Sequence, residues 1–173
     1  MKIKLGKIFF LFLISSLLLN SCSKKTQSPE NNFKNGKVTV YFTKPSKELG
    51  VVLIPVVRKI SKGSSAYQTA IKELFLGPTL EEREKLELNS EIPEGSRLIN
   101  IVEENDSVKI DISSQFMYGG GSESMQVRFR QFRETALTLA KGRPVYLYID
   151  GTLATKIGGE GLEVQQPLNK KNP

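Results

Sequence analysis

The chain of 173 residues offers few side chains for catalysis. It contains no histidine and a single cysteine, Cys22, so histidine-activated nucleophiles and histidine metal ligands are excluded. A carboxylate pair, a Ser–Lys pair or an oxygen-only metal site remains, and the candidate acids are Asp106, Asp111 and Asp150. Each has a simpler interpretation: Asp106 fits a hairpin turn, Asp111 the outer face of a strand, and Asp150 a turn before glycine. We therefore expect a protein that is not an enzyme and that holds no metal or cofactor.

Two further patterns could bind anions. Gly119-Gly120-Gly121 precedes a predicted helix, and the N–H groups at a helix N-terminus attract anions. No Lys or Arg lies inside this loop, so a flexible connector is the simpler interpretation. The second pattern is a set of arginines that could face anionic lipid or glycan: Arg97, Arg128, Arg130, Arg133 and Arg143. Helical spacing divides this set between faces, which favours a solvated surface.

Two tyrosines are the best candidates for a binding surface. In a predicted strand over 145–149, Tyr146 and Tyr148 alternate with aliphatic residues that face the core. Aromatic side chains presented in this way are common anchors of interfaces. We predict Tyr146 and Tyr148 as an interaction surface. The alternative, that they cover the sheet beneath a helix, stays open.

The first 22 residues have the three parts of an export signal. Lysines lie within residues 1–7, and an apolar run over 8–19 is shorter than the roughly 20 residues that span a bilayer. Leu19-Asn20-Ser21-Cys22 then resembles the lipobox of bacterial lipoproteins. The resemblance implies that residues 1–21 are removed and that the Cys22 thiol carries a diacylglyceryl group. The protein is then exported and anchored to a bacterial membrane; an uncleaved anchor or a buried helix is the alternative.

The residues after Cys22 are polar and mildly basic. Residues 22–36 have the composition of a flexible tether, with an r.m.s. reach of about 20 Å. From Cys22 onward the chain has 22 basic and 18 acidic residues, a net charge of +4, because three of the 25 basic residues precede it. Lys and Arg are scattered along the chain without a patch of stacking aromatics, so we expect no nucleic-acid partner.

Hydrophobic periodicity predicts one small α+β domain over 37–165. The expected elements are strands over 37–43 and 51–57, a helix after a Ser65/Gln68 capping box, a short helix up to about residue 86 after a Thr79/Glu82 capping box, a hairpin with arms 97–103 and 108–113, a long helix capped by Ser122, and a strand over 145–149. These predict a mixed, mostly antiparallel sheet with two helices on one face. Pro55 assigns the strand over 51–57 to an edge or a bulge.

The long helix carries the predicted core stripe. Its apolar residues are spaced 4, 3, 4 and 3 apart, at Met125, Phe129, Phe132, Ala136 and Leu139. Phe129 and Phe132 are expected to pack against the sheet through Ile110 and Leu147. Residues 166–173 are polar and are expected to form a disordered tail.

Four short motifs occur in order along the chain: the helix end "LFLGP" at 74–78, the turn "IPEGS" at 92–96, the strand "VKIDIS" at 108–113 and the turn "IDG" at 149–151. Together they resemble the Germane (GerMN, sporulation and spore germination) domain family. The resemblance covers roughly residues 38–164. It implies a fold related to ring-building motifs and a non-enzymatic assembly module of the cell envelope, with an unknown envelope protein as partner and a possible oligomer. The alternative is an envelope-bound protein that binds a small ligand or glycan, which a deep apolar pocket would favour.

Overall fold

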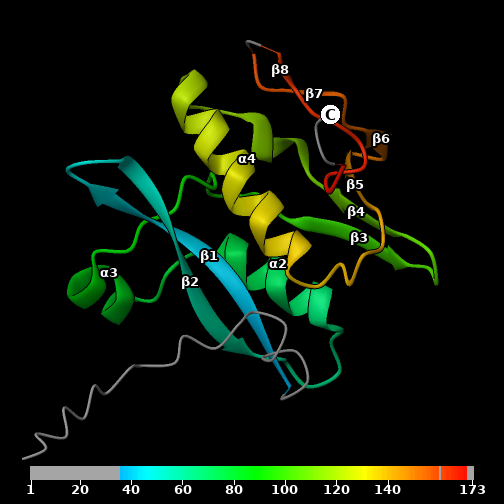
Figure 1. Ribbon diagram of the computed structural model, residues 1–173, viewed down its shortest axis with the longest axis horizontal. Coiled ribbons are helices and arrows are strands. Elements are labelled where there is room, and N and C mark those ends of the chain that lie inside the picture. Colours follow the sequence, from blue (N-terminus) through cyan, green and yellow to red (C-terminus); the bar gives the residue numbers. More distant parts are fainter. Residues whose placement is uncertain (1–35, 160, 171–173) are drawn as a thin grey trace, which may run out of the picture.

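The computed structural model describes residues 36–159 and 161–170 (Figure 1). The predicted export signal, Cys22 and the tether up to residue 35 lie outside the described residues. Within the described part of the chain, no helix is both long enough and apolar enough to cross a membrane.

Two long strands open the fold as an antiparallel hairpin. β1 spans Lys37–Ser46 and β2 spans Gly50–Lys59. β1 buries the apolar residues that its alternation predicts, Val38, Val40 and Phe42. β2 pairs with β1 alone, which confirms the edge position that Pro55 indicated.

The second edge of β1 is closed by side chains of the long helix α4 (Ser122–Leu137). The Tyr41 N–H donates to Thr135 Oγ1 at 3.1 Å, and the Tyr41 carbonyl accepts from Gln131 Nε2 at 3.2 Å. Further along, Thr43 forms an isolated antiparallel bridge with Asn89. These contacts satisfy the backbone where another strand would pair, so β1 and β2 form a separate sheet rather than part of one continuous sheet.

The two predicted capping boxes are confirmed. α2 spans Ala66–Leu76, and Ser65 and Gln68 exchange side chain–backbone hydrogen bonds at its start. α3 spans Leu80–Leu86, with the same exchange between Thr79 and Glu82. Gly77, at φ 78°, ends α2 in a conformation that favours glycine. α2 packs its buried face against β1, α4 and β3, whereas α3 buries no side chain fully.

The second sheet has four strands in the order β3-β4-β5-β6. They span Leu98–Glu103, Val108–Ile112, Val145–Ile149 and Thr152–Leu153. β3 and β4 form the predicted hairpin, β4 and β5 are parallel, and β5 and β6 are antiparallel. The three α-helices and the mixed, mostly antiparallel strands of the described residues confirm the predicted α+β class.

The long helix buries a wider face than its apolar stripe. Phe132 is fully buried and Phe129 partly buried, and both belong to the core that contains Ile110 and Leu147. Beside this stripe, α4 also buries three polar side chains, Arg128, Gln131 and Thr135. The helix begins one residue earlier than expected: Gly121, not Ser122, is its N-cap. A short 3₁₀ helix, η1 (Ser114–Met117), precedes it and buries Phe116.

The C-terminal segment differs from the expected disordered tail. After the short strands β7 (Lys156–Ile157) and β8 (Leu162–Glu163), residues 166–170 pack along β5, and Leu168 is only 2% exposed. The Gln166 and Asn169 side chains exchange hydrogen bonds with the backbone of β5 and its neighbours. The side-chain amides of this segment bond the backbone of β5 where a neighbouring strand would otherwise pair. The polar composition therefore reflects a segment that covers a strand edge, not a disordered one.

Candidate interaction surface

The surface predicted at Tyr146 and Tyr148 lies on the four-stranded sheet, on the face opposite the core. The aliphatic residues of β4 and β5 are buried against the helices, while the two tyrosines between them are half-buried. In the parallel register of these strands, Tyr146 lies beside Lys109 and Tyr148 beside Asp111. The strand alternation read from the sequence therefore orients both tyrosines correctly.

Two rows of side chains cross this face. One row contains Val102, Lys109 and Tyr146, and the other contains Asn100, Asp111, Tyr148 and Leu153. We call these seven residues the open sheet face. Val102 is 40% exposed and Leu153 39%, so apolar surface remains accessible at both sides of the tyrosines.

Two shallow hollows lie on the open sheet face and meet at Lys109 and Tyr148. The larger, about 300 Å³, includes both tyrosines, Pro144 and Leu153, and the smaller, about 200 Å³, includes Asn100, Val102 and Gly151. Strand and loop residues alone line both hollows. The tyrosines are therefore not covered by a helix, which was the alternative left open; their role in binding stays a prediction.

The charges on this face are largely internally paired. Lys109 Nζ lies 3.0 Å from Glu104 Oε1, and Ser107 Oγ donates to the other Glu104 oxygen at 2.7 Å. The Ser107 and Lys109 hydrogen bonds lower the pKa of Glu104, and the Glu104 carboxylate raises the pKa of Lys109. Both groups keep their charge near neutral pH, so the face presents a fixed polar pattern around two aromatic rings.

Two of the three candidate aspartates, Asp111 and Asp150, accept hydrogen bonds from backbone N–H groups. Asp111 Oδ1 accepts from the Gly151 N–H at 3.0 Å, and Asp150 Oδ1 accepts from the Ser114 N–H at 3.3 Å. These bonds hold the turn after β5 against the end of β4. Asp106 lies in the turn of the β3–β4 hairpin. The described residues contain no group of three or more acids, cysteines or histidines placed to hold a metal.

The glycine loop lines a hollow of about 540 Å³. Its walls are Gly119–Gly121 with the start of α4 on one side and the β7–β8 turn on the other, and its apolar lining comes from Met117, Tyr118, Met125, Ile157 and Leu162. Among its polar side chains are Ser122 and Gln126, both exposed. The hollow is broad and open, unlike a deep pocket with converging polar groups.

Arg128 does not lie on a solvated surface, contrary to expectation. It is only 3% exposed, and its guanidinium donates to four carbonyl oxygens, those of Glu91, Phe116, Tyr118 and Gly119, at 2.8–3.1 Å. Burial lowers the pKa of Arg128, and the nearby Glu91 carboxylate opposes this effect. Arg128 thus fixes the glycine loop and the 89–91 segment against α4, which leaves it no free donor pair for an anion.

The other arginines are divided between faces, as helical spacing indicated. Arg97 and Arg130 are exposed. Arg133 donates to the Leu168 carbonyl at 2.8 Å, and Arg143 donates to the Glu104 carbonyl at 2.9 Å. The set therefore makes no common anion site.

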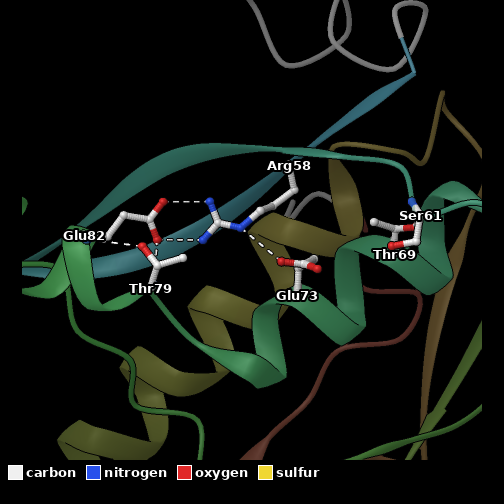
Figure 2. A network of polar contacts seen from close by, with 6 residues as sticks. All are labelled: Arg58, Ser61, Thr69, Glu73, Thr79 and Glu82. Atoms are coloured by element: carbon white, nitrogen blue, oxygen red, sulfur yellow. Dashed lines mark hydrogen bonds and ion pairs between the residues drawn. The ribbon is translucent and has the colours of Figure 1, made fainter.

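The strongest charge network of the described residues was not identified from the sequence (Figure 2). Arg58, on β2, makes two hydrogen bonds of 2.7 Å to Glu82 and one of 3.1 Å to Glu73, and its guanidinium lies 5.4 Å from the centre of the Phe42 ring. The Arg58 hydrogen bond is the main cause that lowers the pKa of Glu82. The sequence contained one indication of this network. Glu82 was predicted to be the capping-box partner of Thr79, and a carboxylate held in place in this way is a good partner for a nearby arginine.

Comparison with known proteins assigns the family. The model of the family Germane, "Sporulation and spore germination", matches residues 39–155. The chain belongs to the Germane family. Its fold is similar to the first GerMN domain of the sporulation protein GerM from Bacillus subtilis, at 17% identity over 75% of this chain and 95% of that one, with a TM-score of 0.57. No curated protein matches the chain.

A second structure of GerM is also similar to this chain. The tandem GerMN domains of the same Bacillus subtilis protein match at 17% identity over 76% of this chain, with a TM-score of 0.54. This chain spans only 45% of that structure. At this identity both structures show the fold alone, and they confirm the Germane α+β fold that the four motifs predicted.

Proposed function

We propose that this Germane protein is an exported lipoprotein that works as a non-enzymatic interaction module of the bacterial cell envelope. Membership of a sporulation and spore germination family supports an envelope role. The export signal and the lipobox-like Leu19–Cys22 support anchoring through the Cys22 thiol. Two or more acyl chains on one residue anchor a protein stably, whereas one chain binds only marginally.

The observation that carries the binding role is the open sheet face. Tyr146 and Tyr148 present two aromatic rings next to a fixed Lys109–Glu104 pair, with exposed Val102 and Leu153 on either side. A central pair of aromatics with a polar surround is the usual composition of a protein-binding patch. Asp111, on this face, accepts a hydrogen bond from the Gly151 N–H, which favours a structural role over catalysis for this carboxylate.

The second candidate function is binding of a small ligand or glycan. The hollow between the glycine loop and the β7–β8 turn favours it, because it has a volume of about 540 Å³ and has two methionines and Tyr118 in its lining. Its openness and its few polar groups make it the weaker candidate.

A matched set of tyrosine variants tests the binding role. We expect the Tyr146→Ala/Tyr148→Ala double variant to lose a specific envelope partner captured by the wild type, and Tyr118→Ala to keep it. Tyr118 is a suitable control because it is 60% exposed and lies at the competing hollow. Loss of the partner in Tyr118→Ala but not in the double variant would indicate that the partner binds at that hollow instead. Circular dichroism must show all variants folded.

Anchoring is tested at Cys22. We expect the wild-type protein to fractionate with membranes and its N-terminal peptide to carry a diacylglyceryl group by mass spectrometry. Cys22→Ala should be released or mislocalised, since the acyl chains have no other attachment point. An unmodified N-terminus together with unchanged membrane fractionation of Cys22→Ala would disprove the lipoprotein assignment.

A further inference from the structure

Charge is distributed unevenly along the folded domain. Basic residues occur throughout, but acidic residues do not. Residues 36–72, which form β1, β2 and most of α2, contain seven basic residues and one acidic residue; residues 73–170 contain eleven basic and sixteen acidic residues. The first segment therefore has a net charge of +6 and the second −5. Such asymmetry between parts of a chain is typical of proteins that bind an anionic surface.

Ion pairs neutralise only two of the seven basic residues. Lys44 lies 3.1 Å from Glu87, and Arg58 is bound by Glu73 and Glu82. The other five make no ion pair with any described residue: Lys37, Lys47, Lys59, Lys62 and Lys72.

Three of these lysines gather at one end of the β1–β2 hairpin. Lys37 lies directly opposite Lys59 in the register, an arrangement of like charges that destabilises a strand pair. Lys62 follows three residues later, in the turn that joins β2 to α2. The Ser61 N–H bonded to Thr69 Oγ1 at 3.2 Å holds this turn against α2. We call Lys37, Lys59 and Lys62 the basic end.

The basic end is also where the chain enters the domain. The Ile60 N–H donates to the Gly36 carbonyl at 2.9 Å, so the first described residue is fixed beside the end of β2. In Figure 1 the start of β1 and the end of β2 lie together at one end of the hairpin. Only thirteen residues lie between Cys22 and Gly36. A random-coil chain of that length would have its ends about 20 Å apart on average.

We propose that the basic end docks the domain on anionic lipid headgroups. This inference rests on the proposed anchoring at Cys22, which would keep the basic end close to the bilayer. A membrane is favoured over an acidic protein because three of the five unpaired lysines lie at the end that the anchored segment joins. Each lysine near an anionic bilayer contributes about fivefold in affinity, so three contribute on the order of 100-fold. Docking orients the open sheet face relative to the membrane.

A vesicle-binding experiment separates docking from anchoring. The chain from residue 22 onward, with Cys22→Ser, cannot be lipidated, and it retains the whole core because all core residues lie between Val38 and Leu168. Its binding is measured by co-sedimentation with vesicles of phosphatidylcholine alone and with 30% phosphatidylglycerol. The test variant is Lys37→Gln/Lys59→Gln/Lys62→Gln.

The control variant is Arg97→Gln/Lys156→Gln/Lys170→Gln, which removes the same charge from exposed residues that form no ion pair with a described residue. We expect binding only to vesicles with phosphatidylglycerol, about 100-fold weaker binding of the test variant, and little change in the control.

A second readout places the docked face. A fluorophore at Ser61→Cys should be quenched by quencher-labelled lipid, and one at Thr152→Cys, on β6, should not. The proposal would be overturned if the test variant bound as well as the wild type, or if both triple variants were weakened equally. It would also be overturned by equal binding to neutral vesicles or by equal quenching at both positions. Selective binding to an acidic protein or to DNA, with no binding to vesicles, would overturn it as well. Because the chain used here cannot be lipidated, these results are independent of whether Cys22 carries lipid.

Discussion

Removing the charge of Arg58 should destabilise the contact between the hairpin and the helices. Arg58 joins three elements: its guanidinium, on β2, binds Glu73 on α2 and Glu82 on α3. The Arg58 and Glu82 side chains are only 13% and 15% exposed, so water cannot fully replace either partner. Arg58→Met keeps an unbranched apolar side chain and removes the guanidinium that makes the three hydrogen bonds and lies over Phe42.

The expected loss in the free energy of unfolding follows from the geometry of the Arg58 contacts. A hydrogen bond to a charged group contributes about 1.5–3 kcal/mol, and removal of one partner from a fully buried ion pair costs about 3–5 kcal/mol. Because Glu73 is 28% exposed and can regain water, we expect about 2–4 kcal/mol for Arg58→Met. That is a large part of the roughly 5–15 kcal/mol that stabilises a typical domain.

The stability lost in Arg58→Met should depend on pH. The pKa of Glu82 is lowered in the folded protein, chiefly by the Arg58 hydrogen bond and further by the Thr79 N–H, against the opposing effect of burial. A lowered folded-state pKa gives stability that is present above the unfolded pKa of about 4.3 and is lost as pH falls through the folded pKa. The stability difference between wild type and Arg58→Met should therefore be largest near pH 7 and shrink below about pH 4.

Urea unfolding at pH 7 and pH 3 measures this difference. Glu82→Gln is the matched partner variant, because glutamine keeps the capping box with Thr79 and removes only the charge. The two variants should be strongly non-additive in a double-mutant cycle, since both break the same pair. A difference that is the same at both pH values, or additive variants, would refute this account of the network.

Three further predictions concern packing. Phe132→Ala should cost about 3–5 kcal/mol by urea unfolding and Phe129→Ala clearly less, because Phe132 is fully buried and Phe129 only partly; equal costs would contradict the helix orientation. Truncation after Gln165 should cost at least about 2 kcal/mol, since it removes buried Leu168 and the cap of β5, and an unchanged melting temperature would contradict that packing. Arg128→Met should make the glycine loop more sensitive to limited proteolysis by leaving its carbonyls without a donor; an unchanged cleavage pattern would contradict that role.

The periodic elements could be predicted from the sequence because each follows from local spacing. The alternation in residues 145–149 correctly predicted that Tyr146 and Tyr148 point away from the core. The Ser65/Gln68 capping box correctly predicted where α2 begins. The same local rules predicted that Phe132 faces the core.

Features that depend on distant partners could not be predicted in this way. The buried polar row of α4 is explained only by its partners, such as the Tyr41 backbone for Gln131. The order of residues 166–170 likewise depends on the edge of β5, which Asn169 caps across 24 positions of sequence. The separate β1–β2 sheet follows from the same cause, because Gln131 and Thr135 occupy the edge where another strand would pair.

Site-specific crosslinking in intact membranes tests the central claim most directly. A photoreactive amino acid replaces Tyr148 on the open sheet face, or Tyr118 at the competing hollow, in the otherwise unchanged full chain. The proposed interaction module predicts a single reproducible protein adduct from position 148, absent from position 118 and competed by the unlabelled wild-type domain but not by Tyr146→Ala/Tyr148→Ala. An adduct formed only from position 118, or one that the double variant competes equally well, would contradict it.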